Sequence, residues 1–182
     1  MGAWRALATG SAGEFTEQVK AMKESIPLQI EYEKWLAGHR QVEPAASGDD
    51  QWKSLDFGDG AVPSPEFDES SWPAIDLPSL FERATGDFDG AVWFRKKIDL
   101  PSSWKGKDLV LSLGPIDDMD RTYFNGTLVG AIEESGHWQV PREYDVPGEL
   151  VNEGGNIVSV RVIDNQGGGG IYGAPGSMKI AV

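Results

Sequence analysis

The stretch that decides the fold is Ala91–Leu100, AVWFRKKIDL, in which side chains alternate along the chain. One face carries the apolar residues Val92, Phe94, Ile98 and Leu100. The opposite face carries Trp93, Arg95, Lys97 and Asp99. A period of two is typical of a β-strand with one face in a hydrophobic core. The stretch therefore predicts a strand within a β-domain.

Similar strands follow toward the C-terminus. Leucines alternate over 109–113, and residues 178–182 end the chain with another short strand. Residues 156–163, NIVSVRVI, are apolar on both faces, which is typical of a central strand. Asn125-Gly126 predicts a type I′ hairpin turn between strands at 120–124 and 127–132. Six or more short strands joined by Gly/Pro turns predict a mainly β fold, an antiparallel β-sandwich.

The segments before residue 90 differ from this pattern. Residues 41–90 are rich in Pro, Gly, Ser and Asp, but isolated aromatic residues are too frequent there for a disordered linker, so we expect a loop-rich wrap laid across one face of the sandwich. In residues 1–40, helical spacing predicts two short α-helices, over 14–24 and 25–38. The expected division is a helical connector, 1–40, and a β-sandwich domain, 41–182.

Composition narrows the possible partners. The chain has 182 residues, a formal net charge of −13 and no cysteine, which excludes disulfides and cysteine-ligated metals. Clustered cations, which nucleic acids and anionic membranes require, are absent from the sequence. We expect no nucleic-acid partner, no membrane partner and no cofactor. Neutral molecules, cations or proteins remain as partners.

Several strings resemble the sugar-binding jelly-roll domain of glycoside hydrolase family 2. They are Asp89–Lys96 (DGAVWFRK), Leu100-Pro101, Trp104–Lys107 (WKGK), the Phe124-Asn125-Gly126 hairpin and Gly155–Val162 (GNIVSVRV). The resemblance implies a sandwich of jelly-roll, galactose-binding-like type.

Further strings narrow the resemblance to the inserted β-domain of sialate O-acetylesterases. They are Leu111–Asp118 (LSLGPIDD), Thr122–Gly126 (TYFNG) and Asp164–Gly173 (DNQGGGGIYG). The resemblance covers roughly residues 51–182. It implies that the chain is a domain of a carbohydrate esterase whose catalytic lobe is missing, and that the parent enzyme is periplasmic or secreted.

The catalytic segments of that family are missing from this sequence. The resemblance implies a Ser nucleophile in Gly-Asp-Ser and an Asp-x-x-His pair, but Gly-Asp-Ser is absent, and the residues three positions before His39 and His137 are Leu36 and Glu134. Acyl transfer needs a nucleophile, a base and an oxyanion hole together. We therefore expect no catalytic residues and no esterase activity from this chain alone.

The glycine-rich string is the sharpest candidate for a contact site. Such a run persists in a folded protein where the backbone approaches another group closely or takes positive φ. Residues expected to contact carbohydrate, a sialoside or other glycoside, or the missing catalytic lobe are Trp93, Tyr123, Asn125, Asp164, Gln166, Gly168, Gly169 and Tyr172. Each has a simpler interpretation: the aromatic pair as core, Asn125 as a turn and the glycines as a surface loop.

Acidic residues offer weaker candidates. The turn Asp117-Asp118-x-Asp120 and the pair Asp87-x-Asp89 could bind Ca²⁺, but neither matches an EF-hand, and capping of their own backbone is the commoner role. No metal site is therefore assigned. Glu133 and Glu134 are adjacent on an extended chain and point apart, which argues against a glycosidase acid–base pair.

Two other classes of function stay open beside the esterase insert. One is an autonomous carbohydrate-binding module, and the other is a purely structural or interaction domain.

Overall fold

A computed structural model describes residues 4–11, 50–53, 55–86 and 88–182, with the backbone alone for 4–11, 50–51 and 84–85. Within these residues no helix is long and apolar enough to cross a membrane.

The described residues form strands with little helix. The strands are β1 (Trp4–Ser11), β2 (Ala74–Ile75), β3 (Ser79–Leu80), β4 (Gly90–Leu100), β5 (Leu109–Asp117), β6 (Met119–Phe124), β7 (Thr127–Ile132), β8 (Pro141–Val146), β9 (Gly154–Asp164), β10 (Gly170–Ile171) and β11 (Lys179–Ala181). The helices are α3 (Asp50–Lys53) and α4 (Glu82–Thr85), with 3₁₀ turns η1 (Ser102–Trp104) and η2 (Gly148–Leu150).

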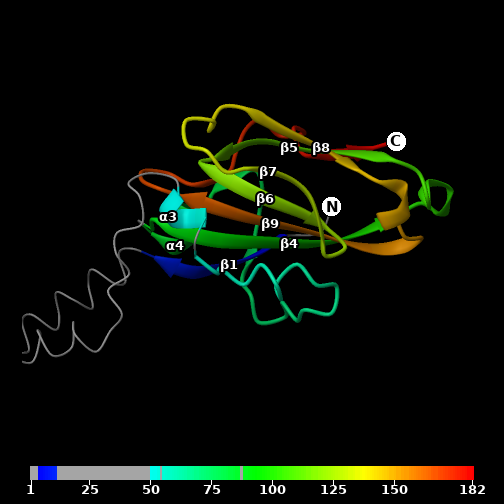
Figure 1. The fold of residues 1–182 in the computed structure, drawn as a ribbon, viewed down its shortest axis with the longest axis horizontal. Helices are drawn as coiled ribbons and strands as arrows, with labels where there is room; N and C mark the ends of the chain where they lie inside the picture. The colour runs from blue at the N-terminus through cyan, green and yellow to red at the C-terminus, as the bar shows by residue number, and fades with distance from the viewer. Residues whose placement is uncertain (1–3, 12–49, 54, 87) are drawn as a thin grey trace, which may run out of the picture.

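The strands make two sheets that lie face to face (Figure 1). Sheet A has six strands in the order β2-β1-β4-β9-β6-β7. Sheet B contains β11, β5, β10 and β3 in that order, with β8 also paired to β5. Every pairing in the described residues is antiparallel. The predicted fold class, an antiparallel β-sandwich, is confirmed.

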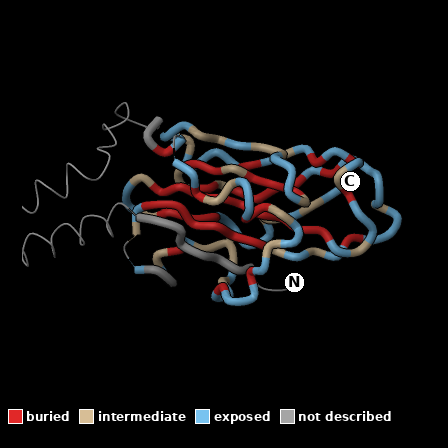
Figure 2. The backbone as a smooth tube through the Cα atoms, turned by 60° about the horizontal axis from the view of Figure 1, so that its bottom comes forward, coloured by how far each residue is buried: buried red, intermediate tan, exposed pale blue. Residues whose placement is uncertain are grey.

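The main core lies between the sheets, where buried backbone is concentrated in the central strands (Figure 2). Val92, Phe94 and Leu100 of β4 enter this core, and Ile98 packs against it half-buried, as their alternation predicts. The predicted central strand is also confirmed, because β9 lies between β4 and β6 and is buried on both faces from Asn156 to Asp164.

The N-terminus differs from the sequence-based expectation. The two helices expected over 14–24 and 25–38 lie outside the described residues. The part of the expected connector that the structure describes, Trp4–Ser11, is strand β1, which pairs with β4 from Arg5↔Arg95 to Ser11↔Gly90. A helical assignment is therefore wrong for these eight residues. These residues pair with the edge of β4, a tertiary contact that the local sequence does not reveal.

The expected wrap is present over the described residues 52–72. It crosses the outer face of sheet A, the face that points away from the main core, and its apolar side chains pack there in two clusters. One cluster joins Trp52 and Phe57 to Ala91, Met119 and Ile163. The other joins Val62 and Trp72 to Trp93 and Tyr123. The central strands of sheet A, β4, β9 and β6, are thus covered on both faces.

Candidate functional site: a cleft at one end of the sandwich

Two of the residues expected to contact sugar, Trp93 and Tyr123, lie beneath the wrap. Trp93 is fully buried, and its Nε1 donates to the carbonyl oxygen of Phe57 at 2.6 Å. Tyr123 is 6% exposed, and its hydroxyl donates to Asp59 at 2.7 Å. Burial and the neighbouring Asp59 carboxylate raise the pKa of Tyr123 to about 12. Both rings serve core packing, and the wrap leaves neither ring face open to a sugar.

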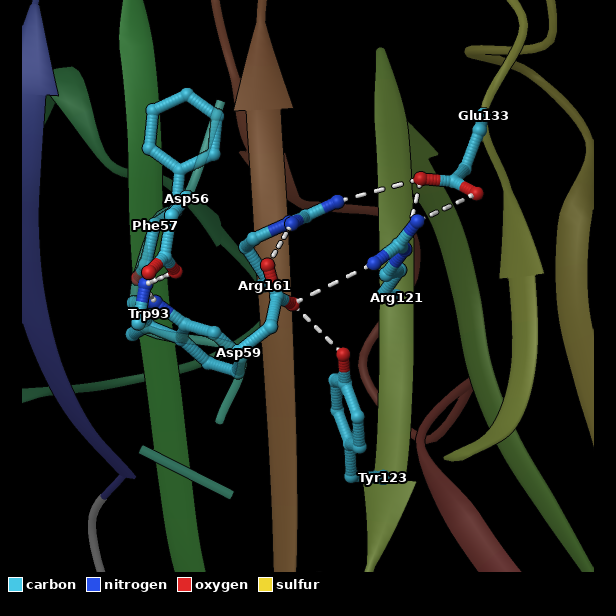
Figure 3. A network of polar contacts seen from close by, with 9 residues as sticks. Asp56, Phe57, Asp59, Trp93, Arg121, Tyr123, Glu133 and Arg161 are labelled. Carbon is cyan, nitrogen blue, oxygen red and sulfur yellow. Dashed lines mark hydrogen bonds and ion pairs between the residues drawn. The ribbon is translucent and has the colours of Figure 1, made fainter. Parts of the chain in front are cut away.

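A charged network holds the wrap against these rings (Figure 3). Arg161, from β9, pairs with Asp59 of the wrap and with Glu133 after β7. Arg121, from β6, joins the same two carboxylates, 2.7 Å from Glu133 and 3.9 Å from Asp59. The Arg161 guanidinium also lies 5.6 Å from the centre of the Phe57 ring. Each charged group of the network is paired with one of opposite sign, so the network fastens the wrap to sheet A.

Asn125 lies at the other end of the sheet from the glycine-rich loop. Asn125 and Gly126 have φ of 48° and 87°, the positive values that the predicted type I′ turn requires. The Asn125 side chain donates to Leu150 O and Asn156 Oδ1 and accepts from the Ile157 amide. β9 continues from there to Asp164, a span of roughly 25 Å at the rise of a strand. Asn125 is a turn residue, remote from the other candidates.

Two glycines of the 167–170 run, Gly169 and Gly170, are explained by packing. A Cβ at Gly169 would lie 2.4 Å from Phe81 Cζ and 2.6 Å from Asp164 Cβ, and one at Gly170 would lie 2.6 Å from Ser79 O. Gly169 also donates its amide to Glu82 at 2.7 Å, and its carbonyl accepts from the Phe81 amide at 2.9 Å. The loop therefore needs glycine in order to fit beside β3 and α4, without any ligand.

A cleft of about 420 Å³ opens beside this loop. Seven described residues line it: Asp117, Asp118, Ser135, Gly136, Trp138, Asn165 and Gln166. They come from the β5–β6 connection, the β7–β8 loop and the residues after β9, three segments that meet at the end of the sandwich where β9 ends (Figure 1). Trp138 is 43% exposed, so the cleft has an aromatic side chain open to solvent.

Buried hydrogen bonds hold the walls of the cleft in place. Arg142, from β8, is 1% exposed and donates to the carbonyl oxygens of His137, Val140 and Asp118 while pairing with Asp120 at 2.8 Å. Tyr172 donates its hydroxyl to Trp138 O at 2.6 Å.

The third segment is tied to the other two by Asn165. Its amide donates to Asp118 Oδ2 at 3.0 Å, and its Nδ2 donates to Ser135 Oγ at 2.7 Å. The cleft is thus preorganised, although its three segments are loops.

Carboxylates crowd this end of the molecule. The pKa of Asp117 is raised to about 7. Burial is the largest cause, followed by a hydrogen bond and charge repulsion from Asp118 and then by repulsion from Asp164 and Glu82. Burial and repulsion from Asp118, Glu82 and Asp89 raise the pKa of Asp164 to about 7, although the amide of Gln166 donates to Asp164 Oδ1. Asp164 is fully buried and its Oδ2 lacks a donor, which agrees with a carboxyl group that holds its proton near neutrality.

The expected site residues are therefore only partly brought together. Gln166 lines the cleft, Tyr172 and Asp164 support it, and Gly168 and Gly169 lie behind it. Trp93, Tyr123 and Asn125 are elsewhere. Sequence analysis did not assign Trp138, Ser135 or Asn165 to a site. A tryptophan in the polar loop ESGHWQ, residues 134–139, was the available signal, because such a loop offers an aromatic ring little to pack against.

The groups that line the cleft are of a kind that can bind a sugar. His137 is held by the carbonyl oxygen of Glu134 at 3.1 Å, and His39 lies outside the described residues. Within the described part of the chain, no three acidic or imidazole side chains are arranged to hold a metal ion. An exposed aromatic ring beside carboxylate and amide groups can stack on the C–H face of a sugar and accept from its hydroxyl groups.

Comparisons with known proteins agree with a carbohydrate-related domain. No model of a known protein family matches the chain. A β-glucuronidase of Formosa agariphila is 24% identical over 130 residues, which cover 64% of this chain and 13% of that enzyme.

Solved structures of glycoside hydrolases also match part of the chain. Bacteroides uniformis β-glucuronidase 2 matches with a TM-score of 0.53 and 26% identity, over 62% of this chain and 15% of the enzyme. A family 2 glycosyl hydrolase of Bacteroides cellulosilyticus matches in fold with a TM-score of 0.51 and 24% identity, over 60% of this chain and 17% of that protein. The chain spans 13–17% of these relatives, and what it shares with them is a β-sandwich related to those of family 2 glycoside hydrolases.

Proposed function

We propose that this chain is the non-catalytic β-sandwich domain of a larger carbohydrate-active hydrolase. The observation that supports this most directly is the structural likeness to Bacteroides uniformis β-glucuronidase 2. The match covers 15% of the length of that enzyme. The cleft adds an exposed Trp138 beside hydrogen-bonding groups. Its role would be to support a catalytic lobe and to contact a sugar through this cleft. The division of the chain at residue 40 stays a prediction.

For the parent enzyme we propose a sialate O-acetylesterase. The support is the sequence resemblance at 111–118, 122–126 and 164–173. The comparisons add nothing to it, because the relatives that they found are glycosidases. In this proposal, the Gly-Asp-Ser and Asp-x-x-His segments belong to a lobe encoded next to this chain. The carbohydrate contact and the esterase parent are separate claims, and each needs its own test.

Acetate release tests the parent. The reading frame around the chain should encode both catalytic segments, and the full product should release acetate from an O-acetylated sialoside while this chain alone releases none. A frame without those segments, or one that encodes a glycosidase barrel instead, would refute the esterase parent. Acetate release by the chain alone would refute the non-catalytic assignment.

An autonomous carbohydrate-binding module is the second candidate, and the exposed Trp138 favours it, because an aromatic ring kept in solvent has little value for stability. The two candidates differ in one measurement. A module binds its sugar equally well alone or within the parent protein, whereas a supporting insert already binds alone through its own cleft but binds more tightly when the catalytic lobe adds contacts to the sugar. Calorimetric titration of both forms separates them.

A further inference from the structure

The charge of the cleft restricts the sugar it can take. Of the seven described residues that line it, Asp117 and Asp118 are carboxylates and none is a cation. A buried cation, Arg142, reaches the cleft wall by donating to the carbonyl oxygen of Asp118. Its Nε is 2.8 Å from Asp120 Oδ1, and both side chains of this ion pair are fully buried. Its charge is thus already neutralised below the cleft floor. The whole chain adds a formal charge of −13.

An acidic ligand would meet repulsion here without compensation. Two unit charges about 6 Å apart at a protein surface repel strongly enough to change affinity by about tenfold. Proteins that bind carboxylate ligands supply arginine or backbone amide donors to meet that charge. Two loop amides at this cleft are already engaged: the Asn165 amide donates to Asp118, and the Gln166 amide donates to Asp164.

Neutral and cationic sugars fit the same groups. A hydroxyl group donates a proton to a carboxylate, and an ammonium group donates and also neutralises it. The exposed ring of Trp138 can lie against the C–H face of either sugar.

Resting on the proposed function, we infer that this cleft binds neutral hexose or amino-sugar residues of a glycan and rejects uronic and sialic acids. The sugar held by the domain is therefore chemically different from the acidic sugars named for its relatives and for its proposed parent. In a full-length enzyme, the domain would engage a neighbouring neutral residue of the glycan while the acidic residue lies in the catalytic lobe.

A matched set of ligands tests the inference. Methyl β-glucoside, methyl β-glucuronide and methyl β-glucosaminide share one ring. The glucuronide carries a carboxylate in place of the C6 hydroxymethyl group, and the glucosaminide carries an amine in place of the C2 hydroxyl group. The galacto series controls for ring stereochemistry. Binding to the full 182-residue chain is followed at pH 8 by amide chemical shifts. Only shifts at 117–118, 135–138 and 165–166 count, because a separate groove near Lys96, Lys97 and Lys179 could attract the acidic sugars.

We expect the neutral and amino sugars to move these signals and the glucuronide to bind about tenfold more weakly than the glucoside. Raising the salt concentration should reduce that ratio, since ions screen exposed charges. Asp117→Asn should bring the glucuronide closer to the glucoside, and Asp118→Asn is a second variant should the first fail to fold. Trp138→Ala should remove all three responses, whereas Leu128→Ala, an exposed apolar residue on β7, should not.

The outcomes separate the two claims. If no sugar of either series shifts the cleft signals, the sugar contact itself is refuted and the inference is lost with it. If sugars bind but the glucuronide binds as well as or better than the glucoside, the charge selectivity is wrong while the sugar contact stands.

Discussion

At the scale of the residue, the loop after β9 shows how a conspicuous sequence feature can have a packing cause. Four consecutive glycines suggest a ligand loop, yet Gly169 is required because its Cα faces the Phe81 ring. A single sequence does not reveal that contact, since Phe81 lies 88 positions away in the chain. The hairpin at Asn125-Gly126, in contrast, is predictable because its cause is local.

Gly169→Ala should destabilise the fold by about 1–3 kcal/mol, because the new methyl group would lie 2.4 Å from Phe81 Cζ. Urea unfolding followed by tryptophan fluorescence measures the loss. Gly155→Ala is the matched control, since nothing lies within 4 Å of its Cβ position and its φ is not positive. Equal stability of the two variants would contradict the packing explanation.

The raised pKa of Asp164 predicts a pH dependence of stability. Its folded-state pKa, about 7, exceeds the ordinary value of 3.8, so folding favours the protonated form. This contribution is present below about pH 4, decreases as the pH rises and is lost above about pH 7. The wild type should therefore lose stability between pH 5 and pH 8.

Asp164→Asn tests this by removing the charge while keeping an oxygen for the Gln166 amide. The variant should gain about 1–2 kcal/mol relative to the wild type at pH 8 and little at pH 5, as judged by thermal unfolding at both values. Asp145→Asn, at an exposed position on β8, should show no such difference between the two pH values. A gain that is equal at both pH values would exclude titration as its cause.

At the scale of the element, the wrap depends on buried arginines of sheet A. Arg95 is 1% exposed, and it pairs with Glu69 at 3.1 Å and donates to the carbonyl oxygens of Val62 and Ser64. Aromatic residues within 41–90 predicted an ordered segment, because disordered linkers are poor in them. The path of the segment was not predictable, since it follows charges on strands that are distant in sequence.

Arg95→Met should release the wrap at a cost of about 3–5 kcal/mol, because Glu69 and two carbonyl oxygens would lose a buried donor. Limited proteolysis should then cleave within 57–72, and amide exchange there should speed up. Arg121→Met is the control: its main partner, Glu133, is not part of the wrap, and Asp59 of the wrap keeps Arg161. The pair that it breaks is 29% and 27% exposed, so we expect a cost below about 1 kcal/mol. If the wrap in Arg95→Met stayed protected from proteolysis and amide exchange, its apolar clusters alone would be enough to hold it on sheet A.

At the scale of the whole molecule, the period-two pattern predicted the sandwich, because burial between two sheets is what produces that pattern. It did not predict β1, whose sequence, WRALATGS, lacks the alternation of β4. Nor did it assemble the cleft, which depends on three loops that only the topology brings together. Loops carry little periodic signal. The sequence therefore shows which chemical groups each loop carries, but it does not show which loops lie next to one another.

Removing residues 1–11 should expose the edge of β4 over 90–95, where β1 now pairs. We expect lower stability and self-association, because an unpaired strand edge is a template for other chains. Size-exclusion chromatography and urea unfolding measure both effects. A chain that lacks only residues 1–3 is the control and should remain like the wild type. A monomeric, fully stable 12–182 fragment would show that β1 is dispensable.

The pairing of Arg5 with Arg95 also governs when the sheet can form. During synthesis, Trp4–Ser11 leaves the ribosome about eighty residues before its partner strand exists. Closing so long a loop makes pairing slow, since distant contacts cost more chain entropy before they are rewarded. Before β4 emerges, β2 offers β1 a pairing at Trp4 and Arg5 alone, so a nascent chain carries most of β1 without a partner until β4 has been made.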